Sequence, residues 1–417
     1  MKYGLIGRRL PHSFSKEIHG MIGSYEYELR ELEPEELESF FRERDFLGIN
    51  VTIPYKEAVM RYLDDISGRA MRVGCVNTVV NRGGKLYGYN TDIDGLTGSI
   101  EILGADISGS KVLILGTGAT SKTAFCAVSD MGAGEIIKVS RNPERNGQGT
   151  VSYEEAVTEH HDASLIINCT PCGMFPDNGS VPIDLEPFTS LLGVLDCVYN
   201  PLRTRLVQNA RAFGIPAGGG MYMLAEQAVK ASERFADTEY PSGLTEEIYK
   251  RVLREKENIV LTGMPGSGKT SVAEILGKRL GKKVFDTDLL IVEKAGMPVT
   301  EIFRIYGEKE FRNMETEVIE EVSKKTGVII STGGGAVLRD GNVRMLKQNG
   351  RIIFLDREPG ELVPTGTRPL ADTSEKIMKL YEERLPVYRK AADETITAGR
   401  GATAADTAAE AERRLKL

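Results

Sequence analysis

Short apolar runs rich in β-branched residues alternate along the chain with longer amphipathic stretches. The runs occupy residues 48–53, 111–115, 136–140, 165–168, 194–198, 259–262, 328–331 and 352–356. This alternation is typical of βαβ units, in which parallel strands form a sheet and the intervening helices cover its faces. The sequence therefore predicts the α/β fold class, with mostly parallel sheets.

Two of the predicted strands run directly into glycine-rich turns that lead into helical sequence. The turns span residues 116–121 and 263–270. A doubly wound sheet ordinarily carries one phosphate-binding turn, after its first strand, so two turns predict two independent nucleotide-binding units. Between the units, residues 237–243 are a predicted loop and residues 244–257 a charged helix with an apolar stripe. We place the main domain boundary near Glu255.

Composition narrows the class of protein. The chain has 417 residues, of which 41% are hydrophobic and 27% charged, as expected for a folded chain of roughly two to three domains. A net charge of −7 offers no overall basic surface to nucleic acid or to an anionic membrane. No apolar run reaches the roughly 20 residues that span a bilayer, and the first residues do not resemble a signal peptide. We expect a cytoplasmic protein with neither a nucleic-acid nor a membrane partner.

The number and positions of the cysteines also indicate the cytoplasm. There are five, all before residue 200, and an odd number does not form the disulfide framework of a secreted protein. Cys169 and Cys172 have the spacing of a redox pair. They lie, however, in a turn of the predicted cofactor domain, so we interpret all five cysteines as ordinary reduced thiols.

The second glycine-rich turn is a P-loop, Gly-x-x-x-x-Gly-Lys-Thr between a strand and a helix. Its backbone N–H groups cradle phosphate oxygens, Lys269 reaches the β and γ phosphates, and the Thr270 hydroxyl ligates Mg²⁺. The predicted nucleotide contacts are Gly263, Gly266, Ser267, Gly268, Lys269 and Thr270. The motif alone does not separate a kinase from a GTPase or an ATPase motor.

Further motifs follow the P-loop in a fixed order. They contain Asp286 and Asp288, Arg312, the three glycines Gly333, Gly334 and Gly335, and finally Arg368 and Arg384. The two acids end a strand, where a metal ligand and an acceptor-binding carboxylate face the phosphates. The glycines allow backbone to approach a ligand closely. Two arginine forks suit a planar carboxylate.

In this order the motifs resemble shikimate kinase, over residues 258 to about 400. The resemblance implies ATP as the nucleotide and shikimate as the acceptor. The implied roles are Mg²⁺ binding for Asp286 and Thr270, catalysis for Asp288, Lys269 and Arg368, ATP contact for Arg368, and shikimate binding for Asp288, Arg312, Arg384 and the three glycines. Positioning and charge neutralisation are what phosphoryl transfer requires. The stretch 361–367 lacks an arginine that such kinases often use to cover adenine, so the adenine contacts stay open.

The first glycine-rich turn is an imperfect dinucleotide fingerprint, Gly-x-Gly-x-x-Ser over residues 116–121. An NAD enzyme usually has an acid at the end of the next strand, where it binds the ribose hydroxyls. Here that strand ends in Ser140 and Arg141, with Arg145 close behind. Two arginines and a hydroxyl favour a 2′-phosphate. The sequence therefore predicts NADP(H) rather than NAD.

Small hydroxyls, amides, one lysine and one aspartate recur in the first hundred residues. They lie in the segments 13–15, 50–56, 74–78 and 88–92. Such side chains are what a polyol carboxylate needs for hydrogen bonding. The sequence therefore predicts a small-molecule site in this part of the chain.

These segments, with later ones at 168–171, 196–202 and 220–227, resemble shikimate dehydrogenase over residues 3–254. The resemblance implies a substrate-binding lobe of residues 1–90 plus 222–254 and a Rossmann-like NADP lobe of residues 91–221, followed by a P-loop kinase domain of residues 258–417. It implies Lys56 and Asp92 as the catalytic pair. The other implied substrate contacts are Ser13, Ser15, Asn50, Thr52, Asn77, Tyr199 and Gln227, and the cofactor contacts are Gly116, Thr117, Gly118, Ala119, Thr120, Ser121, Ser140, Arg141, Arg145, Val198 and Gly220.

The two resemblances together give the hypothesis of a bifunctional enzyme. The first half reduces 3-dehydroshikimate to shikimate with NADPH, and the second half phosphorylates shikimate with ATP. Two alternatives stay open: a quinate or shikimate dehydrogenase that uses NAD, fused to the kinase, or one half that binds a metabolite without catalysis. A homodimer also stays open.

Overall fold

The structure is a computed structural model that describes residues 1–10, 13–23, 25–145, 149–362 and 373–416. The chain divides into two compact units, Met1–Val252 and Leu253–Leu417. The predicted boundary near Glu255 lies close to this division. The further split of the first unit into two lobes stays a prediction.

The first unit begins with a mixed six-stranded sheet. Its strands are β1 (Tyr3–Gly7), β2 (Tyr27–Glu31), β3 (Gly48–Val51), β4 (Asp65–Ile66), β5 (Thr78–Arg82) and β6 (Lys85–Tyr89). Their order is β2-β1-β3-β5-β6-β4. The pairs β3–β5 and β5–β6 are antiparallel, while the other pairs of this sheet are parallel. A two-residue turn with φ of 60° at Gly83 and 86° at Gly84 joins β5 to β6, and such a turn needs no crossover helix.

Short helices pack around this first sheet. They are α1 (Ser15–Ile22), η1 (Pro34–Glu36), α2 (Leu37–Glu43), η2 (Ala58–Tyr62) and α3 (Gly68–Val73). The aromatic rings of Phe40, Phe41 and Phe46 lie 5.4–6.0 Å apart and form part of the buried core. This core fixes the end of β3, from which the predicted site residues 50–56 extend.

The second sheet is wholly parallel. Its strands are β7 (Lys111–Leu115), β8 (Glu135–Val139), β9 (Thr150–Val151), β10 (Leu165–Asn168), β11 (Gly193–Asp196) and β12 (Ala217–Gly218), and its helices are α5 (Ala119–Asp130), η3 (Pro143–Arg145), α6 (Tyr153–Glu159) and α7 (Arg205–Ala212). The strand order is β12-β11-β10-β7-β8-β9. From β7 the chain adds β8 and β9 on one side and then β10, β11 and β12 on the other, so the topology switches between β10 and β7. Ligands bind at the carboxyl ends of the strands at such a switch point, and the glycine-rich turn 116–121 begins there.

Two helices connect the first and second sheets. They are α4 (Asp92–Ile102), which follows β6, and α8 (Met221–Ala236), which follows β12. They pack against each other so closely that a Cβ atom on Gly95 would lie 2.6 Å from the Met223 carbonyl oxygen. The first residue of α4, Asp92, and the second turn of α8, with Gln227, therefore come together. Helix α9 (Leu244–Lys256) follows, as the sequence predicts.

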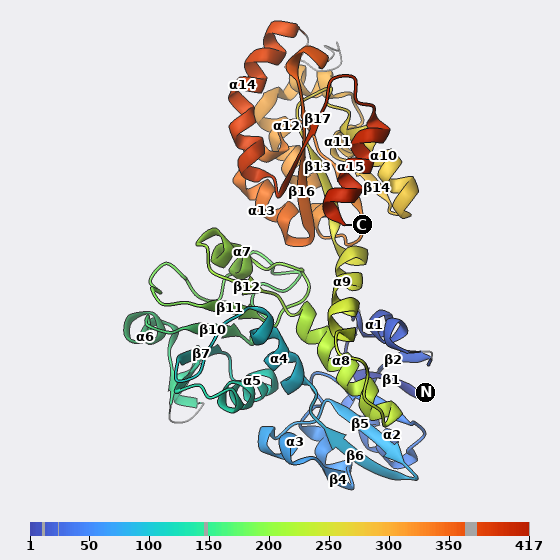
Figure 1. Cartoon of the computed structure of the whole chain (residues 1–417), viewed down its shortest axis with the longest axis vertical. Coiled ribbons are helices and arrows are strands. Elements are labelled where there is room, and N and C mark those ends of the chain that lie inside the picture. The colour runs from blue at the N-terminus through green and yellow to red at the C-terminus, as the bar shows by residue number, and fades with distance from the viewer. Residues whose placement is uncertain (11–12, 24, 146–148, 363–372, 417) are drawn as a thin grey trace. The chain divides into compact units, whose positions relative to one another are not determined.

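The second unit is a five-stranded parallel sheet with helices around it (Figure 1). Its strands are β13 (Asn258–Thr262), β14 (Val284–Asp286), β15 (Ile329–Ser331), β16 (Gly350–Arg357) and β17 (Glu394–Ala398). Its helices are α10 (Lys269–Leu280), α11 (Thr287–Ala295), α12 (Val299–Ser323), η4 (Ala336–Leu338), α13 (Asp340–Asn349), η5 (Pro359–Glu361), α14 (Ser374–Ala391) and α15 (Ala404–Leu415). In the order β14-β15-β13-β16-β17 the central strand is β13. The P-loop leaves the carboxyl end of that strand.

Among the described residues, no helix combines the length and the apolar character that crossing a membrane would require.

Candidate active sites

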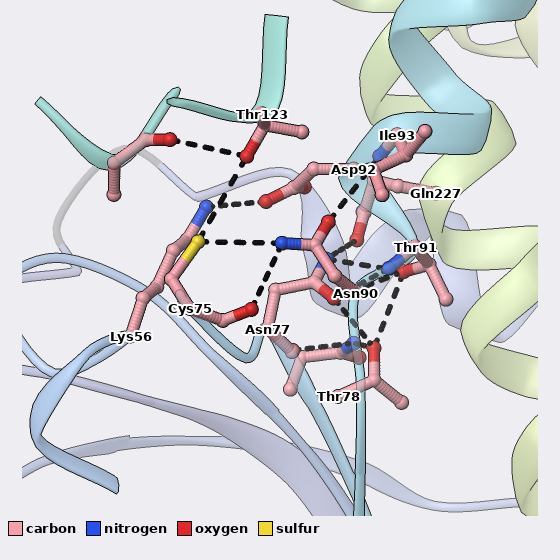
Figure 2. Close-up of polar contacts among 12 residues, drawn as sticks. Lys56, Cys75, Asn77, Thr78, Asn90, Thr91, Asp92, Ile93, Thr123 and Gln227 are labelled. Atoms are coloured by element: carbon pink, nitrogen blue, oxygen red, sulfur yellow. Dashed lines mark hydrogen bonds and ion pairs between the residues drawn. The ribbon is translucent and has the colours of Figure 1, made fainter. Parts of the chain in front are cut away.

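An ion pair lies at the centre of the first candidate site. Lys56 follows β3, Asp92 is the first residue of α4, and Figure 2 shows the two side chains pointing toward each other. The Lys56 Nζ donates to Asp92 Oδ2 at 2.6 Å, and the two side chains are only 14% and 8% exposed. The structure thus brings together two residues that are 36 positions apart in the sequence.

The aspartate keeps this lysine charged. Burial by itself would lower the pKa of Lys56, because it penalises the ammonium form. The Asp92 charge and its hydrogen bond outweigh that effect, so the pKa of Lys56 is raised. The site therefore holds a proton on Nζ next to a carboxylate, as a general acid requires.

Side-chain amides and hydroxyls extend from this pair. Asn77 Nδ2 donates to Thr91 Oγ1 at 3.0 Å and to Gln227 Oε1 at 3.4 Å, and Asn77 Oδ1 accepts from the Thr91 backbone N–H at 2.8 Å. Asn50 Nδ2 donates to Thr78 Oγ1 at 3.0 Å. Figure 2 shows Asn77, Thr91 and Gln227 beside the ion pair. The structure therefore gathers the predicted residues Asn50, Asn77 and Gln227 into one buried network.

Tyr27 was not predicted and belongs to the same network. Its hydroxyl donates to Asn50 Oδ1 at 2.7 Å, and its ring stacks on His19 with ring centroids 3.9 Å apart. All three residues are buried. Burial lowers the pKa of His19 to about 3, so the imidazole is neutral and its own charge does not disturb the network. Tyr27 fixes which way the Asn50 amide points.

The remaining predicted substrate contacts lie on segments next to this network. Ser15 begins α1, is buried, and its backbone N–H donates to Ser13 Oγ at 3.3 Å. Thr52 follows β3 and bonds through its backbone to Ile6. Tyr199 lies in the loop after β11. Burial raises the pKa of its hydroxyl, and the charge of Lys56 offsets part of that rise.

Residues of the second sheet fit a dinucleotide. Gly116 has a φ of 104°, and a Cβ there would lie 3.0 Å from Thr170 Cγ2, so only glycine suits this turn. No atom lies within 4 Å of a Cβ on Gly118, which leaves that side of the turn open. The Ser121 hydroxyl is buried and has no hydrogen-bond partner among the described residues. Thr117, Ala119 and Thr120 complete the turn and the start of α5.

The other predicted cofactor contacts lie at strand ends of the same sheet. Ser140 follows β8, and its hydroxyl accepts from the Asn142 backbone N–H at 3.1 Å. Arg141 and Arg145 are exposed, with no acid at the strand end. Val198 follows β11 and accepts through its carbonyl from the Gly220 N–H at 2.9 Å. The Ser140 hydroxyl and the two arginines fit the 2′-phosphate of NADP(H) better than the diol of NAD.

The second candidate site is built on the P-loop. Lys269 Nζ donates to the carbonyl oxygens of Gly263 and Met264, each at 2.9 Å, so the loop curls around the ammonium. Gly266 and Gly268 have φ of 88° and 89°, and Ser267 is buried. Backbone in this form presents its N–H groups to phosphate.

Oxygen ligands for a divalent ion lie beside the P-loop. The Thr270 hydroxyl donates to Asp286 Oδ2 at 2.9 Å. Asp286 Oδ1 accepts from the backbone N–H of Asp288 at 3.0 Å and caps helix α11. One hydroxyl and one carboxylate next to a phosphate cradle suit Mg²⁺, which keeps several waters and needs few protein ligands.

A cavity of about 560 Å³ extends from the P-loop toward the predicted acceptor residues. Its lining includes Lys269, Thr270, Asp286, Asp288, Arg312, Gly333, Gly334, Gly335 and Arg384. Both arginines are buried, and Arg384 Nη1 donates to the Gly334 carbonyl at 3.1 Å. A Cβ on Gly335 would lie 2.2 Å from the Arg312 guanidinium, and one on Gly333 would lie 2.5 Å from Asp288 Oδ1. These glycines therefore make room for the groups that face the cavity.

Glu315 was not predicted and also lines this cavity. It is fully buried, and its Oε2 accepts from Arg312 Nη1 at 2.8 Å. Burial raises the pKa of Glu315, and the charge of Arg312 opposes that shift. Its Oε1 has no hydrogen-bond partner among the described residues. The spacing of three from Arg312 on a helix could have revealed this ion pair.

Arg368, the predicted lid residue, lies outside the described residues.

Comparisons with known proteins find relatives for both parts of the chain. A family model described as shikimate dehydrogenase substrate binding domain matches residues 5–79, and one described as shikimate kinase matches residues 265–415. A shikimate dehydrogenase (NADP(+)) of Clostridium perfringens is 35% identical over an alignment of 265 residues, and the match covers 60% of this chain and 97% of the relative.

Solved structures give the same result for the first part of the chain. The crystal structure of shikimate dehydrogenase 1 from Peptoclostridium difficile is 32% identical, with a TM-score of 0.56, and the match covers 60% of this chain and 98% of that one. Shikimate 5-dehydrogenase from Thermus thermophilus, solved with NADP(H) and shikimate, is 29% identical with a TM-score of 0.54, over 60% and 99%. The chain therefore belongs to the shikimate dehydrogenase family over its first 60% and carries a shikimate kinase domain after it.

Proposed function

We propose that this chain catalyses two consecutive steps of the shikimate pathway. The first unit reduces 3-dehydroshikimate to shikimate with NADPH, and the second phosphorylates the 3-hydroxyl of shikimate with ATP. The observation that carries the first activity is the Lys56–Asp92 ion pair at 2.6 Å. The hydroxyl made at one site is the nucleophile at the other.

Lys56 acts as the proton donor in the reduction. Reduction of a ketone by hydride leaves an alkoxide that must be protonated, and NADPH, when bound, supplies the hydride. The raised pKa of Lys56 keeps a proton on Nζ at neutral pH. Asp92 holds the ammonium in place, and the amides of Asn50, Asn77 and Gln227 orient the ring hydroxyls. Ser13 and Ser15 bind the substrate carboxylate.

The kinase residues position and neutralise charge. ATP, when bound with Mg²⁺, supplies the phosphoryl group. Lys269 and the P-loop N–H groups hold the phosphates, and Asp286 with Thr270 holds the metal. Asp288 accepts the proton of the shikimate 3-hydroxyl, while Arg312 and Arg384 bind the carboxylate. We assign to Arg368 a contact with the transferring group.

The alternatives make different predictions about cofactor and turnover. An NAD-dependent quinate dehydrogenase would need an acid at the end of β8, where Ser140 and Arg141 stand. A non-catalytic first half would not need a buried lysine held by a buried aspartate. Both observations favour the NADP-dependent enzyme.

Two substitutions test the two-site proposal on one chain. Lys56→Ala should abolish NADPH oxidation by 3-dehydroshikimate and leave ATP-dependent phosphorylation of shikimate unchanged. Lys269→Ala should do the reverse. Lys278→Ala serves as a matched control, because Lys278 is an exposed lysine on the same helix, α10. Loss of both activities in either single variant would contradict independent sites.

We also propose that the enzyme works in the cytoplasm on small molecules. The five cysteines are free thiols, in keeping with a reducing compartment. Both sites are lined by groups that suit small polar carboxylates and nucleotides.

A further inference from the structure

Two cysteines that are 28 positions apart lie side by side in the first unit. Cys169 follows β10 and Cys197 follows β11, and the two Sγ atoms are 3.9 Å apart. The strands are parallel, with Asn168 paired to Asp196, and the Cys197 N–H donates to the Asn168 carbonyl at 2.9 Å. The contact is therefore fixed by the register of the sheet.

This placement suits a disulfide. Neighbouring strands lie about 4.8 Å apart, and disulfide-bonded residues have Cα atoms about 4.4–6.8 Å apart. Both residues are free cysteines in half-buried positions. The Cys-x-x-Cys spacing pointed instead to Cys172. That residue donates through its backbone N–H to Thr170 Oγ1.

The cysteine pair lies beside groups that we assign to the cofactor and to catalysis. A Cβ on Gly116 would lie 3.5 Å from the backbone of Cys169, and one on Gly220 would lie 2.2 Å from the carbonyl oxygen of Cys197. Cys197 also lies close enough to Lys56 to contribute to the raised pKa of that lysine. A covalent bond between the two sulfurs would therefore draw together two strand ends that border the NADP(H) site.

We propose that Cys169 and Cys197 form a reversible intramolecular disulfide that switches off the dehydrogenase and leaves the kinase active. The disulfide itself stands on the geometry alone, while its effect on activity rests on the proposed dehydrogenase function. The oxidant is a low-molecular-weight disulfide.

The exchange takes place in two steps. The Cys169 thiolate attacks one sulfur of the reagent, forms a mixed disulfide and releases one thiolate. Cys197 then loses its proton to solvent and attacks the Cys169 sulfur, which releases the second thiolate. Two protein thiols are oxidised by two electrons, and one reagent disulfide is reduced to two thiols.

The test treats the full-length protein with oxidised glutathione and follows both activities. Peptide mapping should find the peptides of Cys169 and Cys197 joined, with the mass of two hydrogen atoms lost. NADPH-dependent activity should fall, return on treatment with dithiothreitol, and fall in the same way in a Cys172→Ser control. Kinase activity should not change.

Two variants test whether the inactivation depends on these two cysteines. Cys169→Ser and Cys197→Ser, each compared with its own untreated rate, should resist inactivation by the reagent. If no Cys169–Cys197 link forms in the wild type, the disulfide proposal is wrong whatever the activity does. If the link forms and activity is unchanged, the switch is wrong and the dehydrogenase assignment stands. Absence of dehydrogenase activity before treatment would instead overturn the proposed function.

Discussion

Replacing Asp92 by asparagine is the sharpest single perturbation of the dehydrogenase site. The amide is nearly the same size as the carboxylate and still offers an oxygen to Lys56, but it carries no charge. Burial is then the largest influence left on Lys56, and burial lowers the pKa of a lysine. The ammonium should therefore lose its proton at a lower pH in Asp92→Asn than in the wild type.

The expected losses of activity and of stability both follow from the burial of the Lys56–Asp92 pair. General acid catalysis contributes about 10²–10⁴-fold, and a loss of about 10²-fold in kcat/KM corresponds to about 2.7 kcal/mol. Removing one partner of a buried ion pair destabilises a protein by about 3–5 kcal/mol, and the retained hydrogen bond places Asp92→Asn near the lower value. In the wild type the pKa of Lys56 is raised, so this stabilisation is fully present below the ordinary pKa of lysine and is lost as the pH rises through the raised value.

The assay is kcat/KM for reduction of 3-dehydroshikimate at saturating NADPH, measured across pH. Asp92→Asn should lose activity at lower pH on the alkaline side than the wild type does. Asp94→Asn is the matched control, because Asp94 lies on the same helix in an ion pair with Arg69, whose side chain is 48% exposed. Such exposed pairs contribute about 0–1 kcal/mol. A wild-type rate and pH profile in Asp92→Asn would refute the role of the pair.

Three further predictions concern residues around the two sites. Tyr27→Phe leaves the Oδ1 atom of Asn50 without its donor at 2.7 Å, at a cost of about 1–3 kcal/mol, so steady-state kinetics should show a higher KM for 3-dehydroshikimate with little change in kcat. Arg141→Ala should raise the KM for NADPH and leave that for NADH unchanged, and an equal change for both would contradict the 2′-phosphate contact. Burial raises the pKa of Glu315, so protonation at falling pH should remove the anion that holds Arg312 and raise the kinase KM for shikimate. In Glu315→Gln the KM for shikimate should no longer depend on pH in this way. If it changes with pH as in the wild type, Glu315 does not hold Arg312 as proposed.

The buried parallel strands were predictable because each is a continuous apolar run. The predicted strands at 111–115 and 165–168 match β7 and β10 residue for residue. The antiparallel strands β5 and β6 were not predicted, since residues 78–82 and 85–89 mix polar and apolar side chains without a buried run. The strand β14 was predicted together with the acids at its end. The strand β17 was not predicted, because its five residues mix polar and apolar side chains.

Some of the candidate site residues were likewise predictable from the sequence, and others were not. Lys56, Asp92 and Lys269 lie in local motifs, so the sequence indicates them directly. Tyr27 and Cys197 act through partners 23 and 28 positions away, respectively, and nothing in the sequence states which distant strand ends become neighbours. The register of the sheets supplies that information, and only the fold contains it.

One chain makes a hydroxyl at its dehydrogenase site and phosphorylates that hydroxyl at its kinase site. The most direct measurement incubates the full-length chain with 3-dehydroshikimate, NADPH and ATP-Mg²⁺ and follows NADPH loss, ADP release and the phosphorylated product together. We predict shikimate 3-phosphate, with one NADPH oxidised and one ADP formed for each molecule. Two results would show that the chain does not couple the two steps. One is NADPH oxidation that yields shikimate but no phosphorylated product. The other is ADP release only after shikimate is added, with no measurable NADPH oxidation.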